Sequence, residues 1–412
     1  MLNLLPWLIW TLSSLFVVLN YVQQVFPNVI TTELASALNV SESSLGGISA
    51  AYFYAYALLQ IPVGLILDRF GVHRPLAIAI LVASAGTFLF SQAHNASEGL
   101  LSRLLMGASF AFSFLGCLKL VQDWFPVSRF STMAGMTNTL AMLGAACGAP
   151  LAMIVMTIGW RLTLVYTGFA TFFLAILVSM LVRDVPSSAN KGNDRTASPS
   201  FQQMLQLMRN AQVWINASYA TTISLIFVAF GGLWGVDFIR KLYNLDAVAA
   251  ATAGSLLFIG GIAGSIFFGW FSDYLHSRKK PMVFASIGGL TTLCVMLYIQ
   301  NLPFFWFESC LFLIGFFSSA NIISYAVARD LYPNLSGLSI GLLSTCFYVG
   351  SASSQPVVGY LLEFHSKKLD GGINRLTSQD YTFALSSLVV FMAISVLLSL
   401  VIKETMPVAK RQ

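Results

Sequence analysis

The chain has 412 residues, of which 57% are hydrophobic and only 9% are charged, and its formal net charge is +6. A water-soluble domain carries roughly 25% charged residues, so this composition excludes an ordinary soluble protein and indicates one whose solvent is the bilayer. The basic residues lie mostly in short loops between apolar runs, which is typical of topology control and argues against nucleic acid as a partner.

A membrane-spanning helix needs about 20 mostly apolar residues, and about twelve stretches of the chain meet this condition. In chain order they lie at 7–27, 45–67, 75–93, 99–121, 131–157, 161–182, 212–236, 248–271, 281–300, 304–327, 337–361 and 381–402. The sequence therefore predicts an all-α membrane protein with about twelve transmembrane helices in two pseudo-symmetric six-helix bundles.

One polar segment divides the predicted spans into two groups of six. Residues 183–210 are rich in charged residues, serine and proline. We therefore expect an N-terminal bundle at 1–182, a cytoplasmic linker at 183–210 and a C-terminal bundle at 211–412. Residues 201–208 have apolar side chains at helical spacing, which predicts a short helix on the membrane surface. A solvated tether is the alternative for this segment.

The loops on the two sides of the predicted membrane differ in their basic residues. The side that carries the N-terminus holds more than twice as many Lys and Arg residues as the opposite side. Because basic loops stay in the cytoplasm, we expect both termini there. The expected location is a bacterial inner membrane, and the expected state is a monomer.

A loop motif occurs twice, after the second and after the eighth predicted span, with its two aspartates 205 positions apart (273 − 68). A glycine–proline pair in spans five and eleven, Gly144 to Pro150 and Gly350 to Pro356, repeats at an offset of 206. Two motifs at nearly one offset indicate a duplication of six helices. The residues of the two loop motifs are Gly64, Asp68, Arg69, Gly71, Arg74, Gly269, Asp273, Arg278 and Lys279.

The first copy of the loop motif resembles the signature of the major facilitator superfamily, and the second copy sits where that family places it. Arg103 and Gly107 in span four are similar to the family's R-x-x-x-G element, and Gly159-Trp160-Arg161 is similar to a recurring family tripeptide. The resemblance implies a transporter whose central cavity is lined by spans one, four, seven and ten. It also implies a role for Arg103 in transport or gating.

The duplicated loop motif is expected to control gating. Gly64 and Gly269 are expected to let neighbouring helices approach closely, and Asp68 to sit at the positive end of a partner helix or to pair with an arginine. Contacts that form in only one of two states bias the equilibrium between them. Because His276 replaces the second glycine of the motif, we expect the second copy to be the weaker one.

Ionisable residues inside spans are costly and are therefore candidates for function. Arg103, Lys119 and Glu308 fall inside predicted spans. Lys119 has two interpretations, an ion pair with Asp123 four residues on or a contact with a substrate anion. Proton coupling has no obvious carrier, since Glu308 is the only acidic candidate.

Polar uncharged residues within the spans are the other candidates for the solute site. Such groups need partners in lipid, and many are expected to form hydrogen bonds between helices. The candidates for substrate binding or transport, besides Arg103 and Lys119, are Asn20, Gln24, Asn138, Asn321, Tyr325 and Gln355.

These patterns predict a secondary transporter or facilitator that moves a small polar solute by alternating access. The Tyr-rich second span, Gln60 to Gly64, Lys119 and Trp124 to Pro126 resemble bacterial intraphagosomal amino-acid transporters and the lysosomal dipeptide transporter, which implies an amino acid, short peptide or nucleoside as substrate. One alternative is an organic-anion transporter that uses Arg103 or Lys119. Another is a membrane receptor or sensor that retains the fold.

The sequence gives little support to other classes of function. Gly337-x-Ser339-x-Gly341 matches a hydrolase motif, but it opens an apolar span where that motif needs a strand-to-helix turn, so we expect no enzyme. The histidines and cysteines show no metal-ligand spacing, so we expect neither a metal nor a cofactor. The expected partners are a small-molecule solute, the lipid bilayer and a coupling ion, either a proton or sodium.

Overall fold

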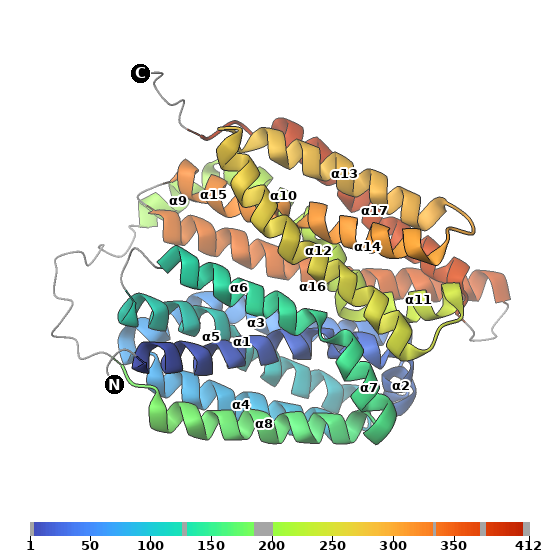
Figure 1. Cartoon of the computed structure of the whole chain (residues 1–412), viewed down its shortest axis with the longest axis horizontal. Coiled ribbons are helices and arrows are strands. Elements are labelled where there is room, and N and C mark those ends of the chain that lie inside the picture. The colour runs from blue at the N-terminus through green and yellow to red at the C-terminus, as the bar shows by residue number, and fades with distance from the viewer. Residues whose placement is uncertain (1–3, 126–129, 185–200, 333–334, 371–375, 407–412) are drawn as a thin grey trace.

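The computed structural model describes residues 4–125, 130–184, 201–332, 335–370 and 376–406. Within these residues the structure consists of helices and their connections (Figure 1). The first group of helices, here called the N half, contains α1 (Leu5–Val29), α2 (Thr31–Leu38), α3 (Glu42–Phe70), α4 (His73–Ser91), α5 (Ala96–Trp124), α6 (Phe130–Ala146), α7 (Gly148–Ile158) and α8 (Trp160–Leu181).

The second group, here called the C half, lies above the first in Figure 1. It contains α10 (Ala211–Ala229), a π-helical turn η2 (Phe230–Trp234), α11 (Gly235–Tyr243), α12 (Ala247–Tyr274), α13 (Lys279–Tyr298), α14 (Phe304–Ser318), a 3₁₀ turn η3 (Ser319–Asn321), α15 (Ile322–Leu331), α16 (Ser336–Asp370) and α17 (Ser378–Val401). A short helix α9 (Phe201–Arg209) precedes the C half, so the segment expected to form a short helix is helical.

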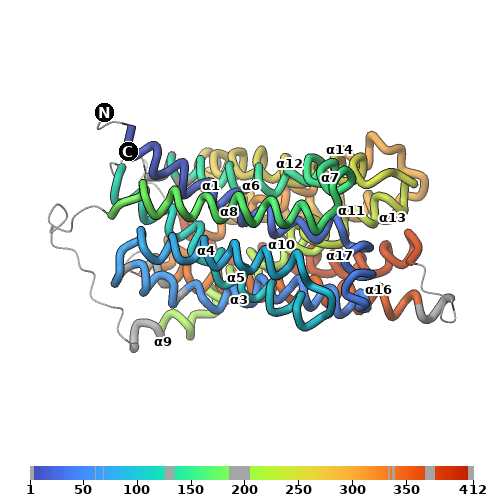
Figure 2. Tube along the Cα trace, turned by 90° about the horizontal axis from the view of Figure 1, so that it is seen from below, coloured from blue at the N-terminus to red at the C-terminus, as the bar shows by residue number. Residues whose placement is uncertain are grey.

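The long helices run along one common direction, as the view from below also shows (Figure 2). α1 begins and α17 ends at one end of the molecule, which we call the terminal end; the opposite end, with α2 and α11, is the distal end (Figure 1). Nine described helical segments are long and apolar enough to cross a membrane, and the bent pair α6–α7 makes ten.

α3 and α16 complete the two sets of six spans, with 29 and 35 residues. They pack against each other at the boundary between the halves. The prediction of an all-α membrane protein with about twelve spans in two bundles is confirmed.

Three spans that the hydropathy pattern predicts as continuous are interrupted. The fifth span bends by 40° at Cys147, between α6 and α7, within the glycine–proline segment. The seventh span passes through η2 and continues to Tyr243, beyond its expected end at residue 236. The tenth passes through η3. Such irregular turns within helices are frequent at functional sites.

Close packing of helices inside each half depends on equivalent glycines. A Cβ atom at Gly107 in α5 would lie 2.0 Å from the carbonyl oxygen of Tyr52 in α3, and one at Gly315 in α14 would lie 1.8 Å from that of Leu257 in α12. Neither position therefore accepts a side chain without separation of the helices. The contact in the N half places Tyr52 and Arg103, one turn before Gly107, beside each other.

Candidate functional site

A hydrogen-bonded polar cluster joins three helices of the N half at mid-depth. The Asn20 amide of α1 donates to the Ser113 hydroxyl of α5 (2.9 Å). Its carbonyl oxygen accepts from the Gln24 amide (3.1 Å) and from the Tyr52 hydroxyl of α3. The structure thus brings together two sequence-predicted candidates, Asn20 and Gln24, with partners from the second and fourth spans.

Aromatic residues from the C half meet this cluster across the boundary between the halves. The rings of Tyr56 in α3 and Tyr348 in α16 lie 4.4 Å apart. Tyr21 in α1 interacts with Tyr56, Tyr348 and the predicted candidate Tyr325. Tyr21, Tyr325 and Tyr348 are half-buried. Tyr348 was missed by sequence reasoning because an isolated tyrosine carries no motif.

Arg103 lies beside this cluster, toward the distal end, and its side chain is fully buried. One guanidinium nitrogen, Nη1, donates to the backbone oxygen of Gln23 (2.9 Å), and the guanidinium carbon lies 4.5 Å from the centre of the Tyr52 ring. Among the described residues, Nε and Nη2 have no hydrogen-bond partner, and neither polar atom of the Gln23 amide has one. No carboxylate of a described residue forms an ion pair with Arg103.

The other predicted candidates lie elsewhere. Gln355 is fully buried, but its amide donates to the Val228 backbone oxygen (3.0 Å) within the C half. Asn138 in α6 and Asn321 in η3 are half-buried, and their side chains make no hydrogen bond to a described residue. Lys119 is half-buried near the terminal end of α5, where its charge acts on Asp123.

Hydrogen bonds between the two halves gather at the distal end. The Asn28 amide at the end of α1 donates to the backbone oxygen of Gly231 (2.8 Å), and its carbonyl accepts from the N–H of Val236 (2.9 Å). The Thr31 hydroxyl donates to the backbone oxygen of Leu233 (2.9 Å). A π-helical turn interrupts the regular α-helical hydrogen-bond pattern, and side chains of the N half bind backbone groups of η2 and of the first turn of α11.

Asp237 completes this distal interface and was missed from the sequence. It is 4% exposed and accepts hydrogen bonds from the Thr32 hydroxyl of α2 (2.9 Å) and the Tyr381 hydroxyl of α17 (3.4 Å). Arg240, one turn on, lies 3.4 Å from the other carboxylate oxygen. Because the seventh span was expected to end at residue 236, Asp237 was placed outside the membrane. The acidic candidate Glu308 is instead half-buried in the first turns of α14.

At the terminal end, each copy of the loop motif has a carboxylate that binds the N–H groups at the start of the next helix. In the first copy, the Asp184 carboxylate, which follows α8, accepts from the N–H groups of Val72 (2.8 Å) and His73 (3.0 Å) at the start of α4. Gly71 has φ +78°, and a Cβ atom there would lie 2.5 Å from the Asp184 carboxylate. A carboxylate at a helix N-terminus is favourable, since it accepts from free N–H groups and faces the positive end of the helix dipole.

In the second copy, Glu404, which follows α17, takes the place of Asp184. Its carboxylate accepts from the Ser277 hydroxyl and from the N–H groups of Arg278 (2.8 Å) and Lys279 (3.2 Å) at the start of α13. Burial raises the pKa of Glu404, but these hydrogen bonds outweigh burial and lower the pKa from 4.5 to about 2. His276 keeps the left-handed turn with φ 48°, so the turn is retained without glycine at a cost of roughly 1 kcal/mol.

Arg278 ties the second copy to the tenth span. Its guanidinium pairs with Asp273 (2.9 Å) and with Asp330 at the end of α15 (3.3 Å). These ion pairs lie within the C half, so in this state Asp273 does not join the halves. The side chain of Asp68 lies outside the described residues, and Arg69 lies over the ring of Phe70 at 5.3 Å.

One expectation for this motif is wrong in the state that the structure shows. Gly64 and Gly269 do not mark close approaches, because a Cβ atom at either position would meet nothing within 4 Å. The close approaches lie deeper in the bundles, at Gly107 and Gly315. Among the described residues, no group of three His, Cys, Asp or Glu side chains is placed to hold a metal ion.

Comparison with known proteins agrees with this architecture. A model of the Major Facilitator Superfamily matches residues 12–355 and 229–412. The chain is 24% identical over 392 residues to the probable galactarate/D-glucarate transporter of Bacillus subtilis (strain 168), with 86% of this chain and 85% of that protein covered. It is 21% identical over 376 residues to the probable sulfoacetate transporter of Cupriavidus necator, with 83% and 84% covered.

Among solved structures, the crystal structure of a bacterial homolog to the human lysosomal transporter Spinster, in an inward-facing and unoccupied conformation, matches with a TM-score of 0.81 and 13% identity over 96% of both chains. Together with the twelve-span architecture and the duplicated loop motif, the family match covers nearly the whole chain. The chain therefore belongs to the Major Facilitator Superfamily and is a multi-pass membrane transporter.

Proposed function

We propose that this protein carries a small organic anion across the membrane by alternating access, and that Arg103 binds the anionic group. The observation that carries the proposal is the environment of Arg103, a fully buried cation with two guanidinium nitrogens that have no hydrogen-bond partner in the described part of the chain. The organic-anion alternative is thereby favoured over an amino acid, short peptide or nucleoside.

An unpaired charge inside a membrane protein is expensive and marks a functional site by default. Arg103 has lost water without gaining a carboxylate, and the neighbouring Gln23 amide is also without partners. A carboxylate or sulfonate that entered here would accept hydrogen bonds from Nε and Nη2 of the guanidinium. Such charge-assisted hydrogen bonds are stronger than hydrogen bonds between neutral groups. The cost of burying the guanidinium is therefore recovered when an anion binds.

The relatives support the same class of solute. Galactarate and D-glucarate are sugar diacids and sulfoacetate is a small dianion, and the names of two related transporters give these as their substrates. Their hydroxyl groups suit a polar cluster such as that of Asn20, Gln24 and Ser113. We propose that this cluster orients the solute while Arg103 holds its charge.

Alternating access would come from motion of residues 1–182 against residues 211–412, with 183–210 as the linker. The hydrogen bonds of Asn28, Thr31 and Thr32 to the C half support a closed distal end. We propose that the terminal end faces the cytoplasm of a bacterial inner membrane, on the basis of the basic loops at that end. The closed end is then the external one, and the proposed working unit is a monomer.

Thermal stability of the purified protein with and without ligand tests the anion site. We expect dicarboxylates and sulfonates to stabilise the wild type, and Arg103→Gln to abolish this effect while raising the stability of the empty protein, because it removes an uncompensated buried charge. Arg161→Gln is the control; Arg161 binds backbone oxygens of Ser91 (2.6 Å) and Ala93 (2.8 Å) at the distal end of the N half. Its loss should lower stability and leave the ligand response in place.

Uptake into proteoliposomes then separates transport from sensing. Accumulation of a stabilising anion supports a transporter, whereas binding without uptake would support the sensor alternative. Stabilisation by amino acids, dipeptides or nucleosides, with none by anions, would overturn the proposal in favour of a neutral or zwitterionic solute. Uptake driven by an imposed proton or sodium gradient identifies the coupling ion, for which the buried Asp237 replaces Glu308 as our acidic candidate.

A further inference from the structure

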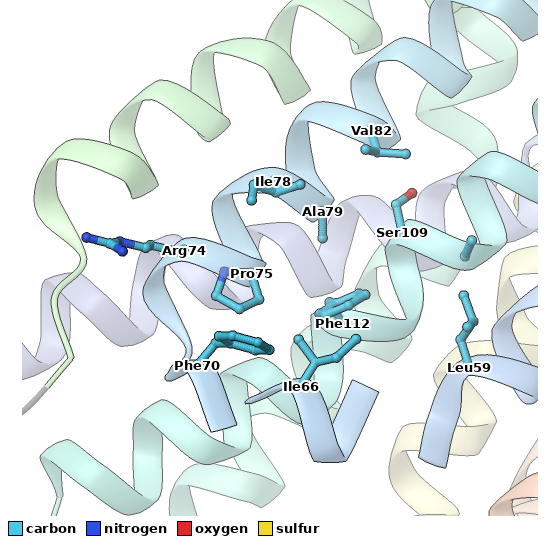
Figure 3. Close-up of a pocket in the computed structure, with 11 residues that line it drawn as sticks. Leu59, Ile66, Phe70, Arg74, Pro75, Ile78, Ala79, Val82, Ser109 and Phe112 are labelled. Atoms are coloured by element: carbon cyan, nitrogen blue, oxygen red, sulfur yellow. The ribbon is translucent and has the colours of Figure 1, made fainter. Parts of the chain in front are cut away.

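An apolar groove of about 500 Å³ lies between α3, α4 and α5, away from the boundary between the halves (Figure 3). Its rim includes Phe70 and Ile78, which are 61% and 62% exposed, so the groove opens on the outside of the N half. The residues that line it are Leu59, Ile66, Phe70, Arg74, Pro75, Ile78, Ala79, Val82, Ala108, Ser109 and Phe112.

The walls of the groove offer almost no hydrogen-bonding group. The Ser109 hydroxyl donates to the backbone oxygens of Leu105 (2.8 Å) and Met106 (2.9 Å) in its own helix, so it is already satisfied. Ala79 and Ala108 leave the space that larger side chains would fill. An apolar, open groove on a membrane-spanning surface fits a hydrocarbon chain and excludes a polar solute.

Two arginines stand at the terminal end of the groove. Arg74 lines it, and the guanidinium carbon of Arg69 lies 5.3 Å from the ring centre of Phe70, which also lines it. Neither guanidinium makes an ion pair or hydrogen bond with a described residue. The nearby Asp184 carboxylate is engaged by the N–H groups of Val72 and His73. Since α3 ends and α4 begins here, both cations lie where lipid headgroups begin.

We infer that this groove binds an anionic phospholipid, with one acyl chain against Ala79 and Ala108 and its phosphate between Arg69 and Arg74. An acyl chain gains no hydrophobic free energy by leaving other lipid, so the preference must come from the headgroup. Each arginine near a membrane surface contributes roughly a fivefold preference for anionic over neutral lipid. The leaflet is the one at the terminal end, where anionic lipids are expected if that end is cytoplasmic.

Native mass spectrometry of the purified full chain tests this site. The probes are phosphatidylglycerol, phosphatidylcholine with the same acyl chains, and glycerophosphoglycerol, which has the headgroup without chains. We expect the wild type to prefer phosphatidylglycerol by about tenfold or more and to retain no glycerophosphoglycerol. Arg69→Gln and Arg74→Gln should each reduce the affinity for phosphatidylglycerol roughly fivefold without changing that for phosphatidylcholine.

Matched variants separate this groove from general attraction to lipid. Arg209→Gln removes an exposed arginine at the end of α9, and Ala170→Phe enlarges an exposed residue of α8; both should leave the preference unchanged. Ala108→Phe fills the groove and should remove the tightest-bound phosphatidylglycerol. An unchanged preference in the Arg69→Gln and Arg74→Gln variants would overturn the inference, as would retention of glycerophosphoglycerol, which would show an anion site that needs no acyl chain.

Discussion

The Thr32 hydroxyl in α2 donates a hydrogen bond of 2.9 Å to the buried carboxylate of Asp237 in α11, across the boundary between the two halves. Asp237 is otherwise held by groups of its own half, Tyr381 and Arg240. Thr32 is thus the side chain through which the N half reaches this carboxylate. If the distal end closes in one state and opens in the other, this bond stabilises only the closed state.

Thr32→Val removes the donor with little change in shape and should shift the equilibrium toward a distally open state. A hydrogen bond to a charged group is worth about 1.5–3 kcal/mol, and the exposure of Thr32 places this one at the low end, so a roughly tenfold shift is expected. Spin labels at Ser36 and Leu242, both exposed at the distal end, measure it as a longer distance in double electron–electron resonance.

Ser309→Ala is the control for Thr32→Val. The Ser309 hydroxyl lies near the distal end of α14 and, among the described residues, bonds only to the Phe305 backbone oxygen of its own helix (2.9 Å). Its loss should leave the distance between the two labels unchanged. Equal distance distributions in wild type and Thr32→Val would show that this hydrogen bond does not hold the distal end closed.

Asn28 offers a second, separable test of the distal interface. Asn28→Leu removes the two hydrogen bonds that join Asn28 to the Gly231 oxygen of η2 and to the Val236 N–H at the start of α11, each worth about 0.5–1.5 kcal/mol. Opening of the distal end would hydrate both groups, so the same pair of spin labels should report a larger open population.

Asn216→Leu is the matched comparison. Asn216 is also buried and donates to a backbone oxygen, that of Ser324 (2.9 Å), but both residues belong to the C half. Its replacement should lower the thermal stability and leave the distal distance unchanged. If both variants lowered stability and neither changed the distance, the contacts of Asn28 would be structural only.

The sequence predicted the elements of this structure better than their contacts. Length and hydropathy decide whether a segment can span a bilayer, so the twelve spans were found. Asn20, Gln24 and Tyr325 were identified because a polar group in lipid needs a partner. The partner of Asn20, Ser113, lies 93 residues further along the chain, and no local pattern pairs the two.

Asp237 shows why hydropathy fails at irregular turns. A charged residue ends an apolar window, so the seventh span was predicted to stop at residue 236. In the structure the π-helical turn continues into α11 and buries Asp237 against Thr32 and Tyr381. The carboxylate is tolerated because hydroxyl and guanidinium donors from three helices surround it, a compensation that depends on tertiary structure.

Alanine substitutions at the motif glycines should separate the two conformational states. Gly64→Ala and Gly269→Ala have free space in this structure and should leave its thermal stability unchanged. If α3 and α12 approach other helices at the terminal end when that end closes, the added methyl groups hinder closure there and lower the uptake rate. Full uptake activity in both variants would show that neither glycine is needed in either state.

Gly107→Ala provides the contrast, because its Cβ atom would lie 2.0 Å from the Tyr52 oxygen in the present state. The helices α3 and α5 must separate, which moves Tyr52 away from Arg103. We expect loss of thermal stability, as overpacking typically costs 1–3 kcal/mol, together with loss of the stabilisation by anions. Stability at the wild-type level would show that the two helices separate without cost.

Glu404 gives a pH dependence whose sign follows from its hydrogen bonds. The lowered pKa, about 2 against 4.5, means that the folded state favours the carboxylate, so this stabilisation is complete above about pH 5 and is lost as the pH falls toward 2. Glu404→Gln keeps the shape but removes the charge at the start of α13.

The melting temperature of wild type minus that of Glu404→Gln should therefore be largest at neutral pH and should shrink between pH 5 and pH 3. Glu33→Gln is the control, since Glu33 is exposed on α2 and its side chain makes no hydrogen bond to a described residue; its difference from wild type should not show this decline. A difference for Glu404→Gln that stays constant down to pH 3 would mean that the neutral side chain caps α13 equally well. The second copy of the motif would then be held by Arg278 and its two aspartates, and not by the charge of Glu404.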